Sequence, residues 1–97
     1  MWLLKTPDNA ATPLTFRMVP GNIKTIGRSP GAEFIVDAAL VSRLHCRVTA
    51  GAAELQVADL ESTNGIFVNG ERVDQAALKE GDRLAVGGVE FVVSRSS

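Results

Sequence analysis

The feature that most constrains the fold is a series of short runs in which apolar and polar residues alternate. Runs of this kind cover residues 14–19, 45–50 and 54–59. A period of two residues is typical of a β-strand with one buried face. In the second run Cys46, Val48 and Ala50 share one face, and in the third Leu55 and Val57 do so. We therefore expect these residues to point into a core between sheets.

Turn signals separate these runs from further short strands. The additional expected strands cover residues 2–5, 23–26, 33–36, 66–68, 71–73, 82–86 and 89–94. Glycine-containing turns at 20–22, 69–70 and 87–88 break the chain at close spacing, which is typical of an all-β protein. The spacing predicts an antiparallel β-sandwich or barrel of about ten short strands with no helix.

The pairing of some strands follows from their position in the chain. The runs 14–19 and 23–26 flank a Pro-Gly-Asn turn, so we expect them to form a hairpin. We expect 2–5 to be an edge strand and 33–36 a central strand. Residues 74–82 are expected to be a connection, because the apolar stretch within them is too short for a stable helix. Residues 94–97 are expected to be a frayed tail.

Composition limits the classes of function. Ten lysines and arginines nearly balance eleven aspartates and glutamates, whereas nucleic-acid binders usually carry a basic excess. No apolar run approaches the length of about eighteen residues that spans a membrane. One cysteine allows no intrachain disulfide, and the N-terminus lacks the pattern of a signal peptide. We expect one domain over residues 1–97, in the cytoplasm, that binds neither nucleic acid nor membrane.

Polar side chains that suit an anion gather in three strand connections. The candidates are Arg28 in the first connection, Ser42, Arg43 and His45 in the second, and Ser62, Thr63 and Asn64 in the third. A guanidinium forms charge-assisted hydrogen bonds with a phosphate, and hydroxyl and amide groups add neutral donors. Loops at one end of a sandwich form a binding surface on a rigid base. The pattern therefore indicates an anion site with amide donors for a nearby peptide.

Four motifs in register resemble the forkhead-associated (FHA) domain. They are Gly27-Arg28, Ser42-Arg43-Leu44-His45, Ser62-Thr63-Asn64-Gly65 and Val68-Asn69-Gly70, and the resemblance extends from about residue 3 to residue 93. It implies a β-sandwich of eleven strands. It also implies recognition of phosphothreonine in partner proteins in Ser/Thr kinase signalling, with no catalysis and no cofactor.

The resemblance also implies roles for five residues of the binding site. Arg28 resembles the family arginine that contacts the phosphorylated residue, and Ser42 resembles the serine that bonds the phosphate. Arg43 stands at a variable polar position and is a candidate for a further phosphate contact or a solvated charge. Thr63 resembles a residue lining the phosphothreonine pocket. Asn64 resembles the asparagine that bonds the ligand backbone.

Five further positions match structural residues of the family. Gly27 and Gly65 allow close approach of the backbone, and His45 is expected to brace its loop. Asn69 and Gly70 suit a two-residue type I′ turn, which requires positive φ angles. These residues are expected to shape the site rather than to contact the ligand.

Leu40 departs from the relatives that carry a basic residue at its position. We expect it to favour an aliphatic ligand residue three positions after the phosphothreonine, unless it folds under the loop and caps the core.

The alternative function is a phosphate-independent interaction or self-association domain of the same fold. An enzyme is disfavoured because no nucleophile triad is evident, and Asp59 with Glu61 is too small a set for a metal.

Overall fold

The computed structural model describes residues 1–96, and within that range the chain is all-β with no helix. The strands are β1 Trp2–Lys5, β2 Thr15–Met18, β3 Ile23–Gly27, β4 Phe34–Ile35, β5 Cys46–Ala50, β6 Leu55–Asp59, β7 Ile66–Val68, β8 Glu71–Val73, β9 Gln75–Leu78, β10 Arg83–Val86 and β11 Val89–Arg95. The prediction of an all-β fold with ten to eleven short strands is confirmed. None of the residues from 1 to 96 belongs to a helix that could cross a membrane.

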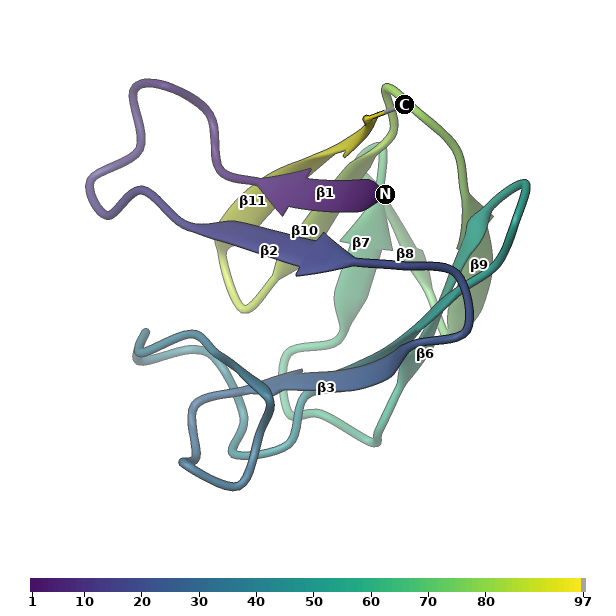
Figure 1. Ribbon diagram of the computed structural model, residues 1–97. Helices are drawn as coiled ribbons and strands as arrows, with labels where there is room; N and C mark the ends of the chain where they lie inside the picture. Colours follow the sequence, from purple (N-terminus) through teal and green to yellow (C-terminus); the bar gives the residue numbers. More distant parts are fainter. Residues whose placement is uncertain (97) are drawn as a thin grey trace.

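The strands form two sheets that face each other (Figure 1). The six-stranded sheet has the order β2-β1-β11-β10-β7-β8, and the five-stranded sheet has the order β4-β3-β5-β6-β9. Every pair is antiparallel except β3 with β4, which is parallel. The fold is therefore a β-sandwich rather than a closed barrel.

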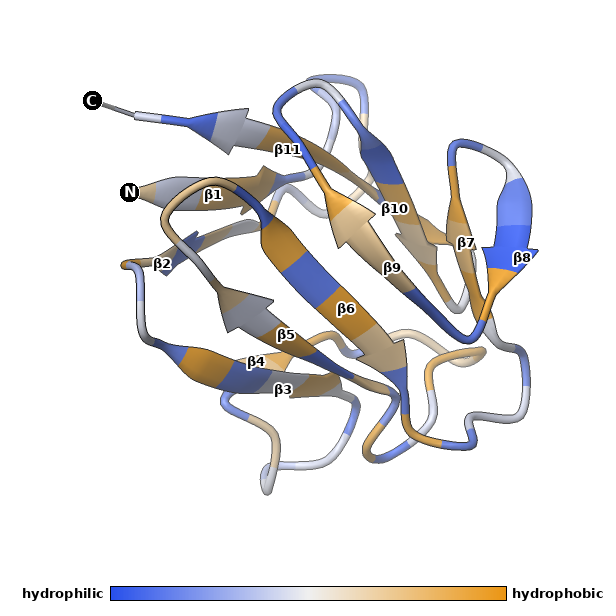
Figure 2. Cartoon of the chain, turned by 90° about the vertical axis from the view of Figure 1, so that its right-hand side faces the viewer, coloured by the Kyte–Doolittle hydropathy of each residue, from blue (hydrophilic) through white to orange (hydrophobic). Residues whose placement is uncertain are grey.

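The core lies between the sheets and follows the alternation in the sequence. On β5 Cys46, Val48 and Ala50 are buried, and on β6 Leu55 and Val57 are buried, as predicted. Figure 2 shows the bands of hydrophobic and hydrophilic residues that alternate along β6. Burial of such side chains contributes roughly 1.5–3 kcal/mol each, so this pattern fixes which face of each strand points inward.

The predicted hairpin between residues 14–19 and 23–26 is wrong. β2 pairs with β1 in one sheet, whereas β3 pairs with β4 and β5 in the other. The turn after β2 carries the chain across the sandwich, and Gly21 donates its backbone N–H to Ala50 at the end of β5. Alternation identifies a strand but does not say which sheet contains it.

Three predicted strand positions are also wrong. β1 lies inside its sheet between β2 and β11, and β4 lies at the edge of the other sheet. Residues 74–82 contain the edge strand β9, which pairs with β6. Arg95 belongs to β11 and stacks on the indole of Trp2. Of the expected frayed tail, Ser97 lies outside the described residues.

Candidate anion-binding site

The connections β3–β4, β4–β5 and β6–β7 meet at the lower end of the sandwich in Figure 1. They enclose an open hollow of about 610 Å³. Its lining residues are Arg28, Ser29, Gly31, Ser42, Arg43, Leu44, Glu61 and Thr63. Four residues that the sequence singled out, Arg28, Ser42, Arg43 and Thr63, therefore share one hollow although they come from three connections.

A close approach of two backbones brings Arg28 next to Ser42. Arg28 donates its backbone N–H to the Ser42 carbonyl at 3.0 Å, and Ser29 donates to the Arg43 carbonyl at 3.1 Å. A Cβ atom on Gly27 would lie 2.8 Å from the Arg43 carbonyl carbon, and closer still to its oxygen. Glycine is therefore required at residue 27, because any side chain there would push the two connections apart.

His45 joins the second and third connections through its buried imidazole ring. The backbone N–H of Ser42 donates to Nδ1 at 3.0 Å, and Nε2 lies 2.8 Å from the Gly65 carbonyl oxygen. Since Nδ1 accepts a hydrogen bond, the proton of the neutral ring is on Nε2, which donates to Gly65. Both ring nitrogens are thus used in positioning the loops, and neither is available for acid–base chemistry.

The hydroxyl group of Ser42 forms a second link between the same two connections. Its Oγ accepts a hydrogen bond from the backbone N–H of Thr63 at 3.1 Å. A hydroxyl also has one hydrogen to donate, and Ser42 lines the hollow. The geometry leaves that hydrogen for an acceptor bound in the hollow, such as a phosphate oxygen.

Hydrogen bonds within the third connection hold its own turn. Ser62 donates its hydroxyl to Asp59 Oδ1 at 2.5 Å and accepts from the backbone N–H of Gly65 at 2.9 Å. Gly65 has a φ of 76°, which is favourable for glycine. Asp59 therefore serves the loop. Across residues 1–96 no group of three or more potential metal ligands is found.

Asn64 and Leu40 lie beside the hollow rather than in its lining. The side-chain amide of Asn64 donates to the Leu40 carbonyl at 2.8 Å, which leaves its carbonyl oxygen and its second amide hydrogen without a partner in this bond. Leu40 is 58% exposed, while its neighbour Val41 is 1% exposed and belongs to the core. The alternative in which Leu40 caps the core is thus excluded, because Val41 takes that place.

Four lining residues were missed by reasoning from the sequence: Ser29, Gly31, Leu44 and Glu61. Ser29 closes the turn after β3, accepting from the backbone N–H of Gly31 at 3.1 Å. Leu44 follows Arg43 in a quoted motif, which was a usable signal. Glu61 has a φ of 57°, an uncommon conformation for a residue other than glycine. The sequence drew attention to Glu61 only as a weak metal candidate with Asp59, not as part of an anion site.

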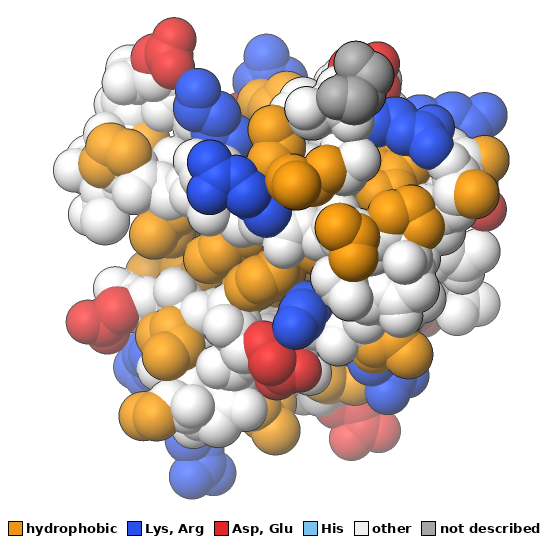
Figure 3. Space-filling model, in the orientation of Figure 1, with side chains coloured by type: hydrophobic (Ala, Val, Ile, Leu, Met, Phe, Trp, Pro, Cys, Tyr) orange, Lys and Arg blue, Asp and Glu red, His pale blue; other side chains and the backbone are white. Residues whose placement is uncertain are grey.

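A second hollow of about 540 Å³ lies between the β1–β2 connection and the β10–β11 turn. Hydrophobic side chains line most of it, and Figure 3 shows hydrophobic side chains exposed across the middle of this face. Its only charged lining residues are Asp37 and Glu90, so it is unfavourable for an anion. The charges of the lining residues therefore make the first hollow the better candidate for an anion site than the second.

The single cysteine does not contribute a reactive group. Burial, with a smaller effect from the charge of Asp59, raises the pKa of the Cys46 thiol from 9.0 to about 12. A thiol with such a pKa stays protonated near neutral pH and is a poor nucleophile. Cys46 acts as a core residue of β5.

An eleven-stranded sandwich with this loop arrangement defines a class of binding module, and comparison with known proteins identifies the family. The family model of the FHA domain matches residues 24–87, which is most of the chain. The chain therefore belongs to the FHA family. The expected resemblance is confirmed, and the family is one of binding modules rather than enzymes.

Solved FHA structures share the whole fold. The FHA domain of CT664 from Chlamydia trachomatis superposes with a TM-score of 0.90 and 25% identity, over 99% of this chain and 98% of that one. The FhaA FHA domain, solved in complex with the intracellular domain of Rv3910, gives a TM-score of 0.84 and 31% identity, over 96% and 99% of the two chains.

Curated relatives are longer proteins. Glycogen accumulation regulator GarA of Mycolicibacterium smegmatis is 39% identical over 66 residues, which are 68% of this chain and 42% of that protein. The ABC transporter ATP-binding/permease protein Rv1747 of Mycobacterium tuberculosis is 35% identical over 79 residues, which are 81% of this chain and 9% of that protein. The chain thus spans less than half the length of these relatives.

Proposed function

We propose that this domain binds phosphothreonine in partner proteins and so recruits targets of Ser/Thr kinases, without catalysis. The observation that carries the proposal is the backbone contact that places Arg28 beside Ser42 in one hollow. Arg28 would bind the phosphate through its guanidinium, and Ser42 would donate its hydroxyl hydrogen. Arg43 lines the same hollow and adds a second positive charge.

The arrangement of the loops supports this function energetically. The contacts from His45, Ser42 and Asn64 hold the loops in place without a ligand. Binding then spends little free energy on ordering the backbone, which favours affinity for a small anionic group. Thr63 would line the threonine side of the pocket, and the Asn64 carbonyl oxygen would accept a hydrogen bond from the ligand backbone.

Relatives of known structure support the ligand class. One FHA structure with a TM-score of 0.82 and 30% identity is described in terms of phosphothreonine-dependent FHA domain interactions. Mycobacterium tuberculosis EmbR, with a TM-score of 0.82 and 25% identity, is described in complex with a low-affinity phosphopeptide. Phosphate-dependent peptide binding is therefore the ligand chemistry to test first in this chain.

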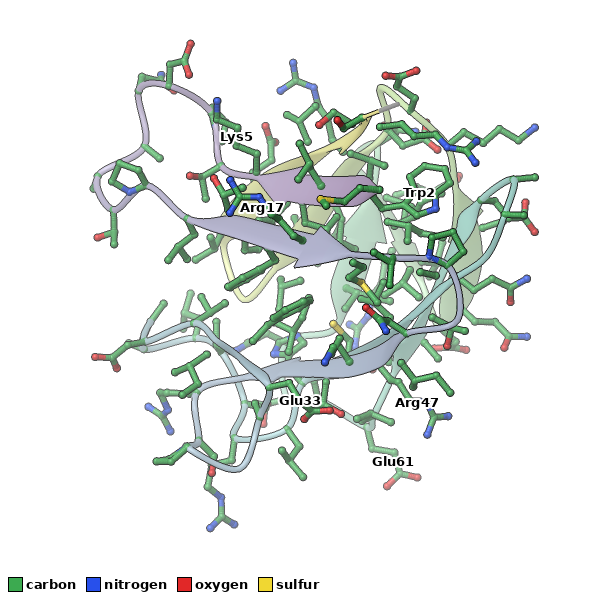
Figure 4. All side chains as sticks on the ribbon, in the orientation of Figure 1. Trp2, Lys5, Arg17, Glu33, Arg47 and Glu61 are labelled. Atoms are coloured by element: carbon green, nitrogen blue, oxygen red, sulfur yellow. The ribbon has the colours of Figure 1, made fainter. Side chains whose placement is uncertain are left out.

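The experiment is a calorimetric titration with a phosphothreonine peptide, selected from a library, and with its unphosphorylated twin. Only the phosphorylated peptide should bind. Arg28→Ala and Ser42→Ala should each weaken binding by roughly ten- to a hundredfold, since a hydrogen bond to a charged group contributes about 1.5–3 kcal/mol. Arg17→Ala is the matched control, because Arg17 is an exposed arginine on β2, away from the hollow (Figure 4).

The titration also distinguishes the proposed function from the alternative of a phosphate-independent interaction domain. Equal binding of both peptides, or unchanged affinity in both folded variants, would refute the proposed phosphate site. That result would favour the phosphate-independent interaction domain of the same fold. Circular dichroism and the fluorescence of Trp2 establish that each variant is folded before its affinity is compared.

A further inference from the structure

Glu61 places a carboxylate in the lining of a hollow whose other charged lining residues are two arginines, Arg28 and Arg43. Its side chain is exposed, and Figure 4 shows it at the lower end of the molecule, pointing away from the sandwich. A negative charge beside a phosphate site opposes binding of the phosphate. Neither the family resemblance nor the proposed site assigns this residue a role.

The loop fixes Glu61 from both sides. Before it, Leu60 donates its backbone N–H to the His45 carbonyl at 3.0 Å. After it, Ser62 is held by Asp59 and Gly65. The positive φ of 57° at Glu61 is thus imposed by neighbours that are themselves held. The direction in which the Glu61 side chain leaves the backbone is consequently fixed by the loop.

No intramolecular partner neutralises this carboxylate among the described residues, where the ion pair present is the one between Arg83 and Glu90. A ligand with a cation at the right position would supply the missing partner. A ligand with an acidic residue there would meet repulsion in addition to that on its own phosphate. Glu61 would therefore distinguish ligands by charge at a position separate from the phosphate.

We propose that Glu61 is a specificity-determining residue that selects phosphothreonine segments carrying a lysine or arginine close to the phosphothreonine. The inference rests on the proposed phosphopeptide binding and names a second requirement of the same ligand. An exposed ion pair is weak, so the expected gain is about two- to fivefold in affinity. The gain falls as salt is added, because exposed charges are screened.

The test uses one phosphothreonine peptide in which each position, from three before to two after the phosphothreonine, is replaced in turn by lysine, alanine or aspartate. With the wild-type domain, lysine should bind two- to fivefold more tightly than alanine at one position, and aspartate more weakly. Glu61→Gln should remove this difference, and Glu61→Lys should reverse it in favour of aspartate. Both variants keep a Cβ atom, so the backbone requirement at residue 61 is unchanged.

Glu71→Lys is the matched control, because it changes the net charge by the same amount as Glu61→Lys. Glu71 lies on β8 opposite Val68, at the end of β7 that is farther from Gly65. The control should keep the wild-type preference. A preference that survives in Glu61→Gln, or that Glu71→Lys abolishes, overturns the inference while leaving the proposed function intact. Failure of every phosphorylated peptide to bind refutes the proposed function and this inference together.

Discussion

Replacement of Gly27 by alanine tests whether close packing of the backbone at residue 27 is what assembles the hollow between the three connections. The added Cβ would lie 2.8 Å from the Arg43 carbonyl carbon and 3.0 Å from Leu44 Cα. These atoms belong to the backbone, so no side-chain rotation relieves the overlap. We expect the β4–β5 connection to move away from β3.

The magnitude follows from the contacts that this movement breaks. The backbone hydrogen bonds from Arg28 to Ser42 and from Ser29 to Arg43 would be lost or stretched, at about 0.5–1.5 kcal/mol each. Residual overlap typically costs a further 1–3 kcal/mol or so. The free energy of unfolding should fall by about 2–6 kcal/mol, which for a domain of this size lowers Tm by roughly 10 °C or more.

Urea denaturation followed by the fluorescence of Trp2 measures the change. Trp2 is the only tryptophan and is 1% exposed, so its emission reports unfolding directly. Gly31→Ala is the stability control, because Gly31 lies in the connection that follows β3 and a Cβ there would meet only Ser29 Oγ at 3.5 Å. Phosphopeptide affinity should fall in Gly27→Ala and stay near the wild-type value in Arg17→Ala, which serves as the binding control because Gly31 itself lines the hollow.

A small effect would refute this reasoning. If Gly27→Ala and Gly31→Ala differ by less than about 0.5 kcal/mol, the range of ordinary surface substitutions, then the β4–β5 connection yields easily. The close approach at Gly27 would then not be what positions Ser42. A large loss of stability with unchanged phosphopeptide affinity would separate folding from the site and would contradict the second half of the prediction.

Three further predictions follow from other parts of the structure. Leu40→Arg should shift the preference three positions after the phosphothreonine from aliphatic towards aspartate in peptide titrations, and the unfolding free energy should change by no more than about 0.5 kcal/mol because Leu40 is exposed; a loss of several kcal/mol would contradict this. Phosphothreonine should bind about fourfold more tightly than phosphoserine in paired peptides, since burying a methyl group contributes roughly 0.8 kcal/mol; equal affinities would mean that no methyl pocket exists. The pKa of Cys46 is raised in the folded state, so its contribution to stability is complete below pH 9 and is lost as pH rises towards 12, by about 4 kcal/mol in total. Urea denaturation across that range should show a steeper decline for the wild type than for Cys46→Ala, and parallel curves would contradict the assignment.

Local patterns predicted the class of fold but not the partner of each strand. Alternation located β5 and β6 with their buried faces, because one buried face imposes a period of two. It did not reveal β9, an edge strand whose alanines give weak alternation. It also paired β2 with β3, because adjacent runs usually pair. The choice between two sheets depends on contacts across the sandwich, which a local pattern does not contain.

For the candidate site too, the sequence predicted the residue types but not the contacts between them. The chemical types of Arg28, Ser42 and Thr63 could be read from the motifs, since they suit a phosphate wherever the loops bring them together. The hydrogen bond from Thr63 to Ser42 joins residues that are 21 apart in sequence, so only the folded structure reveals it. The sequence did not predict that Glu61 lines the site, because an acidic residue in a polar loop is ordinary. Only its backbone angle and its place in the hollow distinguish it.

The ring of His45 has a consequence for the rates of ligand exchange. One rigid imidazole contacts both the β4–β5 and the β6–β7 connection, so the loops need not close over an arriving peptide. Encounter should then depend on diffusion and on attraction to the arginines, and little on the sequence of the peptide. Peptides that share a phosphothreonine but differ in affinity should arrive at similar speeds and differ in how long they remain bound.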